Sequence, residues 1–118
     1  MNCVLLVEDN EKNMKLLRDV LTAKGYRVLE ATSGEEVVEH AAAAGLVLMD
    51  VQLPGIDGVE ALRRLRLDVS TAEIPVLALT AQAMDGDRER FLAAGFDGYL
   101  SKPVDIVELL ATVATYLP

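Results

Sequence analysis

Five side chains that can bind a metal ion or a phosphate stand at or just after the ends of apolar segments. Three are carboxylates, one is a hydroxyl and one is an ammonium group: Glu8, Asp9, Asp50, Thr80 and Lys102. Three carboxylates a few ångströms apart repel one another strongly, and one ammonium group does not balance them. A divalent cation is therefore expected among them. Because the set offers oxygen ligands without cysteine or histidine, it favours Mg²⁺ or Mn²⁺ over zinc, and Mg²⁺ also accepts phosphate oxygens.

Asp50 is notable for the segment that precedes it. Residues 46–49 read Leu-Val-Leu-Met, a continuous apolar run that is typical of a strand buried on both faces. Pro54 and Gly55 then indicate a turn. A carboxylate at the end of a buried strand is costly unless a cation or a hydrogen-bond donor accompanies it. The position of Asp50 therefore indicates a functional group held in a fixed place.

Strand-like and helix-like segments alternate along the chain. The expected strands are Cys3–Val7, Tyr26–Glu30, Leu46–Met49, Ile74–Leu79 and Gly98–Leu100. The expected helices cover Asn10–Lys24, Ser33 to about Ala44, a segment starting at Asp57, Asp85–Ala94 and a segment starting at Asp105. This alternation predicts an α/β fold: one domain over residues 1–118, a doubly wound, flavodoxin-like parallel sheet of five strands with helices on both faces. Ligands bind such sheets at the carboxyl ends of the strands, where all five polar side chains would meet.

Composition limits the classes of partner. The chain has 118 residues, 52% of them hydrophobic, and a formal net charge of −8. Nucleic acids and anionic membrane surfaces bind clustered lysine and arginine, so neither is expected as a partner. The basic segment Arg63-Arg64-Leu65-Arg66 is interpreted as a solvated helix face. The single cysteine, Cys3, is interpreted as a core residue, and without a recognisable signal peptide we expect a cytoplasmic protein.

Four segments resemble a response-regulator receiver domain of bacterial two-component signalling. They are LLVEDNEKNMKLL (5–17), LVLMDVQLPGIDG (46–58), IPVLALTA (74–81) and YLSKP (99–103). Their order and spacing match the family from Val4 to Leu117. Within the family, the chain is most similar to stand-alone regulators and to the receivers of hybrid histidine kinases. Met1 favours a complete single-domain protein over a receiver cut from a longer one, and both remain open.

The resemblance implies a phosphoacceptor site. Asp50 would accept a phosphoryl group from a phosphohistidine of a histidine kinase or a histidine phosphotransfer protein. Glu8 and Asp9 would hold Mg²⁺ together with Asp50 and the backbone carbonyl of Gln52. The chain would then be a phosphoacceptor signalling domain that catalyses only its own phosphorylation and dephosphorylation, and not an enzyme acting on another substrate.

The resemblance also implies a switch. Lys102 and Thr80 would bind phosphoryl oxygens with the backbone N–H of Ala81, and the Lys102–Pro103 peptide bond would be cis. Thr80 would be drawn inward, and Tyr99 would turn into the space behind it. The surface of the fourth helix, fifth strand and fifth helix would change and control a downstream protein, with the chain a monomer or a weak dimer.

Some positions depart from the family pattern. Ala44-Gly45 stands where the family usually has Pro-Asp before the third strand. The second helix is also slightly shorter than usual, which puts its packing in doubt but not the site. Gln52 and Gln82 stand at positions that influence the lifetime of the phosphoryl group in the family, and no direction is predicted for either.

Three other functions fit the sequence poorly. A haloacid-dehalogenase-type phosphatase needs a second aspartate where Gln52 stands, and an FMN-binding flavodoxin would bind a phosphate where Glu8 and Asp9 repel it. His40 could be proposed as a phosphodonor, but a single histidine on an alanine-rich helix is more typical of a surface residue. The remaining alternative is a receiver-like adaptor that signals without phosphorylation, and the complete set of five polar side chains argues against it.

Overall fold

The computed structural model describes residues 2–53, 55–81 and 87–117. Within them, one parallel sheet has the strand order β2-β1-β3-β4-β5. The strands are β1 (Cys3–Val7), β2 (Arg27–Ala31), β3 (Leu46–Asp50), β4 (Val76–Thr80) and β5 (Gly98–Ser101). The helices are α1 (Glu11–Ala23), α2 (Gly34–His40), the 3₁₀ helix η1 (Ala41–Ala43), α3 (Gly58–Leu67), α4 (Asp87–Ala94) and α5 (Ile106–Tyr116).

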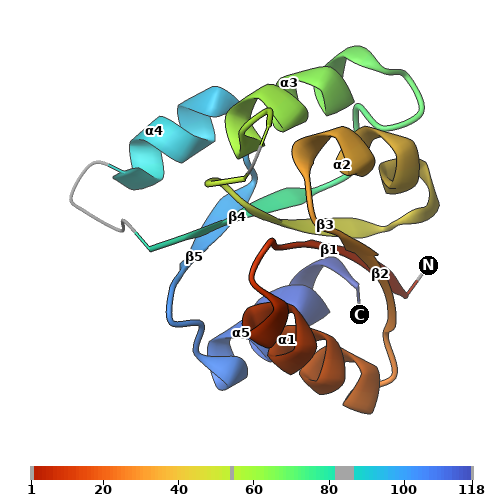
Figure 1. Ribbon diagram of the computed structural model, residues 1–118, viewed down its shortest axis with the longest axis vertical. Helices are drawn as coiled ribbons and strands as arrows, with labels where there is room; N and C mark the ends of the chain where they lie inside the picture. The colour runs from red at the N-terminus through yellow and green to blue at the C-terminus, as the bar shows by residue number, and fades with distance from the viewer. Residues whose placement is uncertain (1, 54, 82–86, 118) are drawn as a thin grey trace.

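The sheet lies between two layers of helices, as the alternating pattern predicts. Figure 1 shows α1 and α5 on one face and α2, α3 and α4 on the other. The chain passes from β1 outward to β2 and then returns to β3 on the other side of β1, so the strand order reverses between β1 and β3. Ligand sites of doubly wound sheets form at this point.

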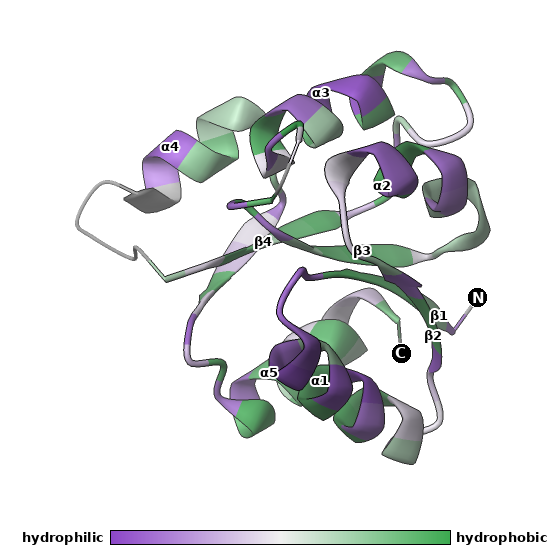
Figure 2. Ribbon diagram, viewed as in Figure 1, coloured by the Kyte–Doolittle hydropathy of each residue, from purple (hydrophilic) through white to green (hydrophobic). Residues whose placement is uncertain are grey.

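The central strands supply the core of both layers. Every residue of β1, β3 and β4 is buried, and apolar residues mark these strands in Figure 2. Alternate residues face opposite layers: Leu5 and Val7 join the cluster under α2 and α3, while Val4 and Leu6 join the cluster under α1 and α5. Cys3 is buried, as expected for a core residue. The polar residues at the carboxyl edge of the sheet are therefore attached to strands that are buried on both faces.

The helices begin where the capping patterns predict. The Ser33 side chain and Glu36 form a complete capping box at the start of α2. Asn10 accepts two backbone N–H groups at the start of α1, and Asp57 and Asp105 each accept the N–H three residues later. These caps fix the point at which each loop leaves the sheet edge.

The four-alanine run differs from the expected helix. The α-helix ends at His40, residues Ala41–Ala43 continue as the 3₁₀ helix η1, and Ala44 is extended, so helical structure reaches about the expected end but changes type after His40. The Gly45 N–H donates to the Cys3 carbonyl at 2.9 Å. The chain must therefore leave the helix early in order to enter the sheet beside β1. The expected start of the fourth helix at Asp85 lies outside the described residues.

Two interpretations of surface residues have different outcomes. His40 is exposed, as expected, and Arg63 and Arg64 lie on a solvated face of α3. Arg66 is not part of this solvated face. Its guanidinium donates to the backbone carbonyls of Ala72, Ile74 and Gly95 and to the Asp97 carboxylate. The solvated-face interpretation is therefore wrong for Arg66. None of the helices in the described ranges has both the length and the apolarity needed to cross a membrane.

Candidate functional site

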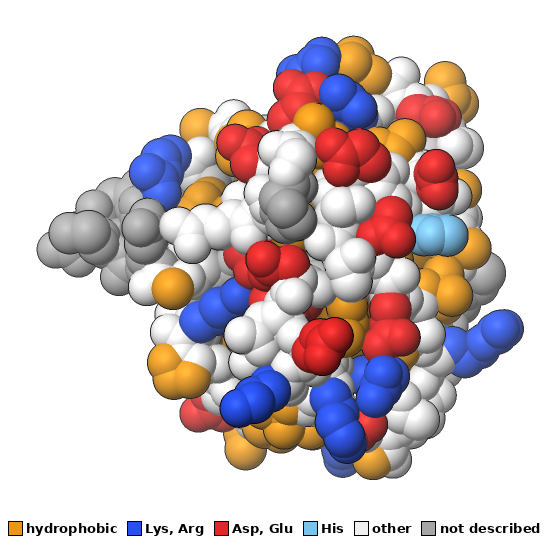
Figure 3. Space-filling view, in the orientation of Figure 1, with side chains coloured by type: hydrophobic (Ala, Val, Ile, Leu, Met, Phe, Trp, Pro, Cys, Tyr) orange, Lys and Arg blue, Asp and Glu red, His pale blue; other side chains and the backbone are white. Residues whose placement is uncertain are grey.

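The three carboxylates meet where the strand order reverses. Val7 pairs with Met49 between β1 and β3, so Glu8 and Asp50 lie next to each other at the same edge. Ligand atoms of Glu8, Asp9 and Asp50 all lie within 4.8 Å of one another. Glu8 and Asp50 are only 1% and 5% exposed, whereas Asp9 is exposed. Figure 3 shows acidic side chains in the middle of the viewed face, between the two helix layers.

Lys102 brings the positive charge to this cluster from the end of β5. Its Nζ lies 2.6 Å from Asp50 Oδ2 and 2.9 Å from Glu8 Oε2. The Lys102 backbone N–H donates to the Thr80 carbonyl at 2.8 Å, which ties the segment after β5 to the end of β4. The Lys102–Pro103 bond is cis, as the resemblance implies.

The charges in the site are only partly balanced. Burial raises the pKa of the Glu8 carboxyl above its ordinary value, and the charge of Asp50 adds to this effect against the lowering influence of Lys102. Burial alone would lower the pKa of Lys102, but the carboxylates of Asp50 and Glu8 raise it. Glu8 Oε2 is buried without a hydrogen-bond partner of suitable geometry. A buried oxygen of this kind fits a role as a cation ligand.

Both oxygens of Asp50 have defined partners. Oδ1 accepts the backbone N–H of Gln52 at 2.8 Å, and Oδ2 accepts the Lys102 ammonium. A Cβ at Gly58 would lie 2.8 Å from the Asp50 carbonyl oxygen, so only glycine lets α3 begin this close to β3. The strand and these contacts hold the carboxylate in one orientation.

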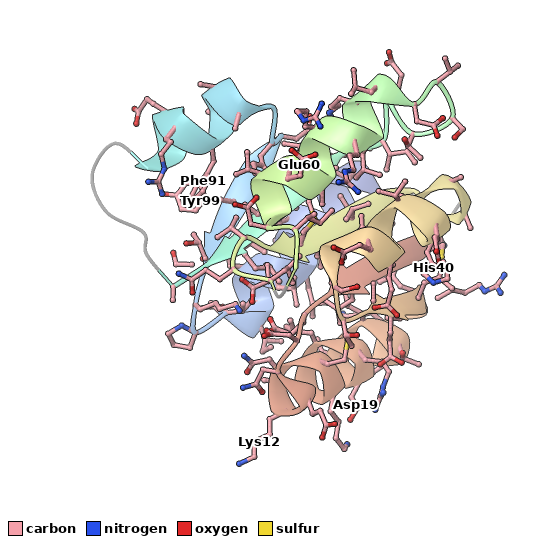
Figure 4. The ribbon with its side chains drawn as sticks, turned by 45° about the horizontal axis from the view of Figure 1, so that its top comes forward. Lys12, Asp19, His40, Glu60, Phe91 and Tyr99 are labelled. Atoms are coloured by element: carbon pink, nitrogen blue, oxygen red, sulfur yellow. The ribbon has the colours of Figure 1, made fainter. Side chains whose placement is uncertain are left out.

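The remaining expected residues lie on β4 and β5. Thr80 ends β4 beside Asp50, is 1% exposed, and is paired in register with Ser101. Ala81 follows it and is exposed, whereas Gln82 lies outside the described residues. Tyr99 is half-buried, and its ring lies 6.0 Å from that of Phe91 on α4 (Figure 4).

The arrangement provides the parts that phosphoryl transfer to a carboxylate needs. A fixed carboxylate can act as the nucleophile, and a bound cation and an ammonium group can neutralise the phosphoryl oxygens. Sequence reasoning missed one carboxylate near this edge. Glu35 on α2 accepts a hydrogen bond from the Ile56 N–H in the loop after Asp50. No local pattern could reveal this contact, because the two residues are far apart in the sequence.

Comparison with known proteins identifies relatives over nearly the whole chain. The family model described as the response regulator receiver domain matches residues 4–114. The polar-differentiation response regulator DivK of Brucella ovis is 43% identical over 116 residues, which cover 97% of this chain and 94% of that protein.

Solved structures of receiver domains are similar to this chain in both fold and sequence. The receiver domain of a sensor histidine kinase from Pseudomonas aeruginosa, solved with a magnesium ion coordinated in its active site cleft, is 38% identical with a TM-score of 0.88. The match covers 97% of this chain and 95% of that one. A Saccharomyces cerevisiae receiver domain, crystallised with a histidine phosphotransfer signalling protein, is 31% identical with a TM-score of 0.86, covering 97% and 87% of the two chains.

Proposed function

The chain belongs to the response regulator receiver family of two-component phosphorelay signalling, and from that membership we propose that Asp50 is its phosphoacceptor. The observation that carries the proposal is the position of Asp50. It ends a fully buried strand, lies within 4.8 Å of two further acids, and pairs with Lys102 at 2.6 Å. The phosphoryl donor is a phosphohistidine of a histidine kinase or a histidine phosphotransfer protein.

The divalent cation is Mg²⁺, with Mn²⁺ as a substitute. Its ligands are Glu8, Asp9, Asp50 and the backbone carbonyl of Gln52. The acid cluster, with the buried Glu8 Oε2 in it, supports this assignment, because hard cations prefer oxygen ligands. When bound, the cation neutralises charge on the phosphoryl oxygens and on the attacking carboxylate.

The residues of the chain position the reacting groups. An oxygen of Asp50 attacks phosphorus as the phosphorus–nitrogen bond to the donor imidazole breaks, and the imidazole takes up a proton. Lys102, already at the Asp50 carboxylate, pairs with a phosphoryl oxygen. Thr80, at the end of β4, and the Ala81 N–H bind the others. In-line positioning and charge stabilisation are the main requirements of phosphoryl transfer.

Phosphorylation changes the surface formed by α4, β5 and α5, and this surface contacts the downstream partner. Phosphoryl oxygens attract the Thr80 hydroxyl, and Tyr99 turns into the space behind it. A local charge change of this kind can bias a two-state element. The partner of this surface is a downstream protein and, with a net charge of −8, not a nucleic acid or an anionic membrane. The chain acts as a monomer or a weak dimer in the cytoplasm, with no substrate beyond its own phosphoryl group.

Intact-mass measurement after incubation with acetyl phosphate tests the proposal. With Mg²⁺, the parent chain should gain one phosphoryl group, whereas Asp50→Ala should gain none. Asp19→Ala is the matched control, because Asp19 is an exposed carboxylate on α1 that pairs with Lys15. A parent chain that gains nothing under any condition would point to an adaptor that works without phosphorylation.

A further inference from the structure

A carboxylate outside the acid cluster ties the loop that follows β3, described at residues 51–53 and 55–57, to α2. Glu35 Oε1 accepts a hydrogen bond from the Ile56 N–H at 3.1 Å. Hydrogen bonds from the backbone N–H groups of Glu35 itself and of Ile56 lower the pKa of the Glu35 carboxyl. The group is therefore ionised at neutral pH, and its oxygens act only as hydrogen-bond acceptors.

Two glycines allow this close approach. A Cβ at Gly34, the first residue of α2, would lie 2.7 Å from the Ile56 carbonyl oxygen. A Cβ at Gly55 would lie 2.7 Å from Glu35 Oε1, and Gly55 also has a positive φ of 73°. The start of α2 and residues 55–56 of the loop therefore lie in direct contact, with the side chains of Ile56 and Glu35 at the point of contact.

The same loop begins at the acid site. The Gln52 N–H donates to Asp50 Oδ1 at 2.8 Å, and the Gly58 N–H donates to the Val51 carbonyl at 3.1 Å. The loop thus has one anchor at Asp50 and Val51 and a second anchor at Glu35. Gln52, which is exposed, lies between the two anchors.

We propose that Glu35 is a positioning residue for the acid site. By holding residues 55–56 on α2, it fixes the backbone path at Gln52, and so it sets the affinity of the site for a divalent cation and the rate at which Asp50 is phosphorylated. The inference rests on the proposed function, in which the Gln52 carbonyl is a cation ligand. A loop freed from one anchor samples more conformations, and only a fraction of them present the carbonyl correctly. Residues that orient metal ligands affect affinity in this way.

Mn²⁺ binding measured by calorimetry on the full chain is the first test. Glu35→Ala should weaken binding by about threefold to tenfold, which corresponds to the loss of one hydrogen bond. Glu35→Gln should stay within about twofold of the parent, because its amide oxygen can still accept from Ile56. Glu39→Ala is the control, since Glu39 is an exposed carboxylate on the same helix.

Phosphorylation by acetyl phosphate supplies a second readout. The initial rate for Glu35→Ala should fall in the same ratio at limiting Mg²⁺ and recover at saturating Mg²⁺, because the nucleophile itself is unchanged. A merely structural contact would lower the melting temperature without moving the cation dependence.

The outcomes separate this inference from the proposed function. Glu35→Ala with the Mn²⁺ affinity of the parent would overturn the positioning role and leave Asp50 as the acceptor. Glu35→Gln behaving like Glu35→Ala would also overturn it, since the effect would then come from charge. A parent chain that is never phosphorylated would refute the proposed function, while the Mn²⁺ comparison would still decide whether Glu35 positions the site. A parent chain that binds no Mn²⁺ would overturn both.

Discussion

Lys102 Nζ lies 2.6 Å from Asp50 Oδ2, although the two residues are 52 positions apart in the sequence. The same ammonium lies 2.9 Å from Glu8 Oε2, so one positive charge faces two buried carboxylates. With Asp9 at the same edge, negative charge exceeds positive charge in a site largely removed from water. Stability and phosphoryl transfer should therefore both respond to changes of charge in this site.

Removing the ammonium group should destabilise the fold. Lys102→Met leaves Glu8 and Asp50 close together without a cation, and we expect a loss of about 2–3 kcal/mol of unfolding free energy in urea without Mg²⁺. Lys15→Met is the matched control: Lys15 pairs with Asp19 at 2.7 Å, but both are exposed, so its effect should stay below about 0.5 kcal/mol. Equal losses in the two variants would contradict this account.

Binding of Mg²⁺ should raise the melting temperature, and this increase should depend on Asp9 as one of the ligands. At Mg²⁺ about ten times above its Kd, linkage adds about 1.4 kcal/mol, which corresponds to an increase of about 5 °C. Asp9→Asn should melt higher than the parent without Mg²⁺, because one repelling charge is gone, and it should gain little when Mg²⁺ is added. Thermal melts followed by circular dichroism measure both effects, and an Asp9→Asn variant that responds fully to Mg²⁺ would exclude Asp9 as a ligand.

Phosphorylation should change the solvent exposure of Tyr99. NMR of the tyrosine rings with a soluble paramagnetic probe, before and after treatment with acetyl phosphate and Mg²⁺, should show the Tyr99 ring becoming less accessible as it turns inward. Tyr26 serves as an internal control, because its hydroxyl donates to the Leu117 carbonyl away from the site. If Tyr99 kept its exposure after phosphorylation, the proposed switch would be wrong.

Arg66 should matter more for stability than its neighbours on α3. Its guanidinium donates to three backbone carbonyls and to Asp97, whose Oδ2 also accepts the Val76 N–H. Arg66→Met should cost about 2–3 kcal/mol in urea unfolding, because several half-buried acceptors lose their donor. Arg63→Met, which removes only an exposed pair with Glu60, should cost less than about 0.5 kcal/mol. A small effect at Arg66 would mean that water replaces the lost donor.

Glu60 gives a prediction for acid pH. Hydrogen bonds from Arg63 and Arg64 lower the pKa of Glu60 from 4.5 to about 2. Since the folded pKa is depressed, the stabilisation is fully present above about pH 4.5 and disappears as the pH falls towards 2. The difference in melting temperature between the parent and Glu60→Gln should therefore be positive near neutral pH and vanish near about pH 2. A difference that stays constant over this range would show that the ion pairs do not stabilise the fold.

The sequence by itself determined the fold and the set of residues at its edge. Buried parallel strands are continuous apolar runs, so Leu46–Met49 identifies a central strand without any knowledge of its neighbours. Caps such as Ser33 with Glu36 are local as well, because the hydrogen-bonding groups lie three residues apart. Since parallel strands share one carboxyl edge, the residues that follow them had to meet there.

Only the tertiary structure decided which of those groups touch and what holds them in place. The pairing of Lys102 with Asp50, the contact of Glu35 with Ile56 and the four acceptors of Arg66 join segments that share no periodicity. The end of α2 at His40 was also set in this way, because Gly45 must reach the Cys3 carbonyl. Such contacts depend on the distance between backbones in the folded chain. Neither propensity nor hydrophobic pattern encodes that distance, since both describe only what neighbouring residues favour.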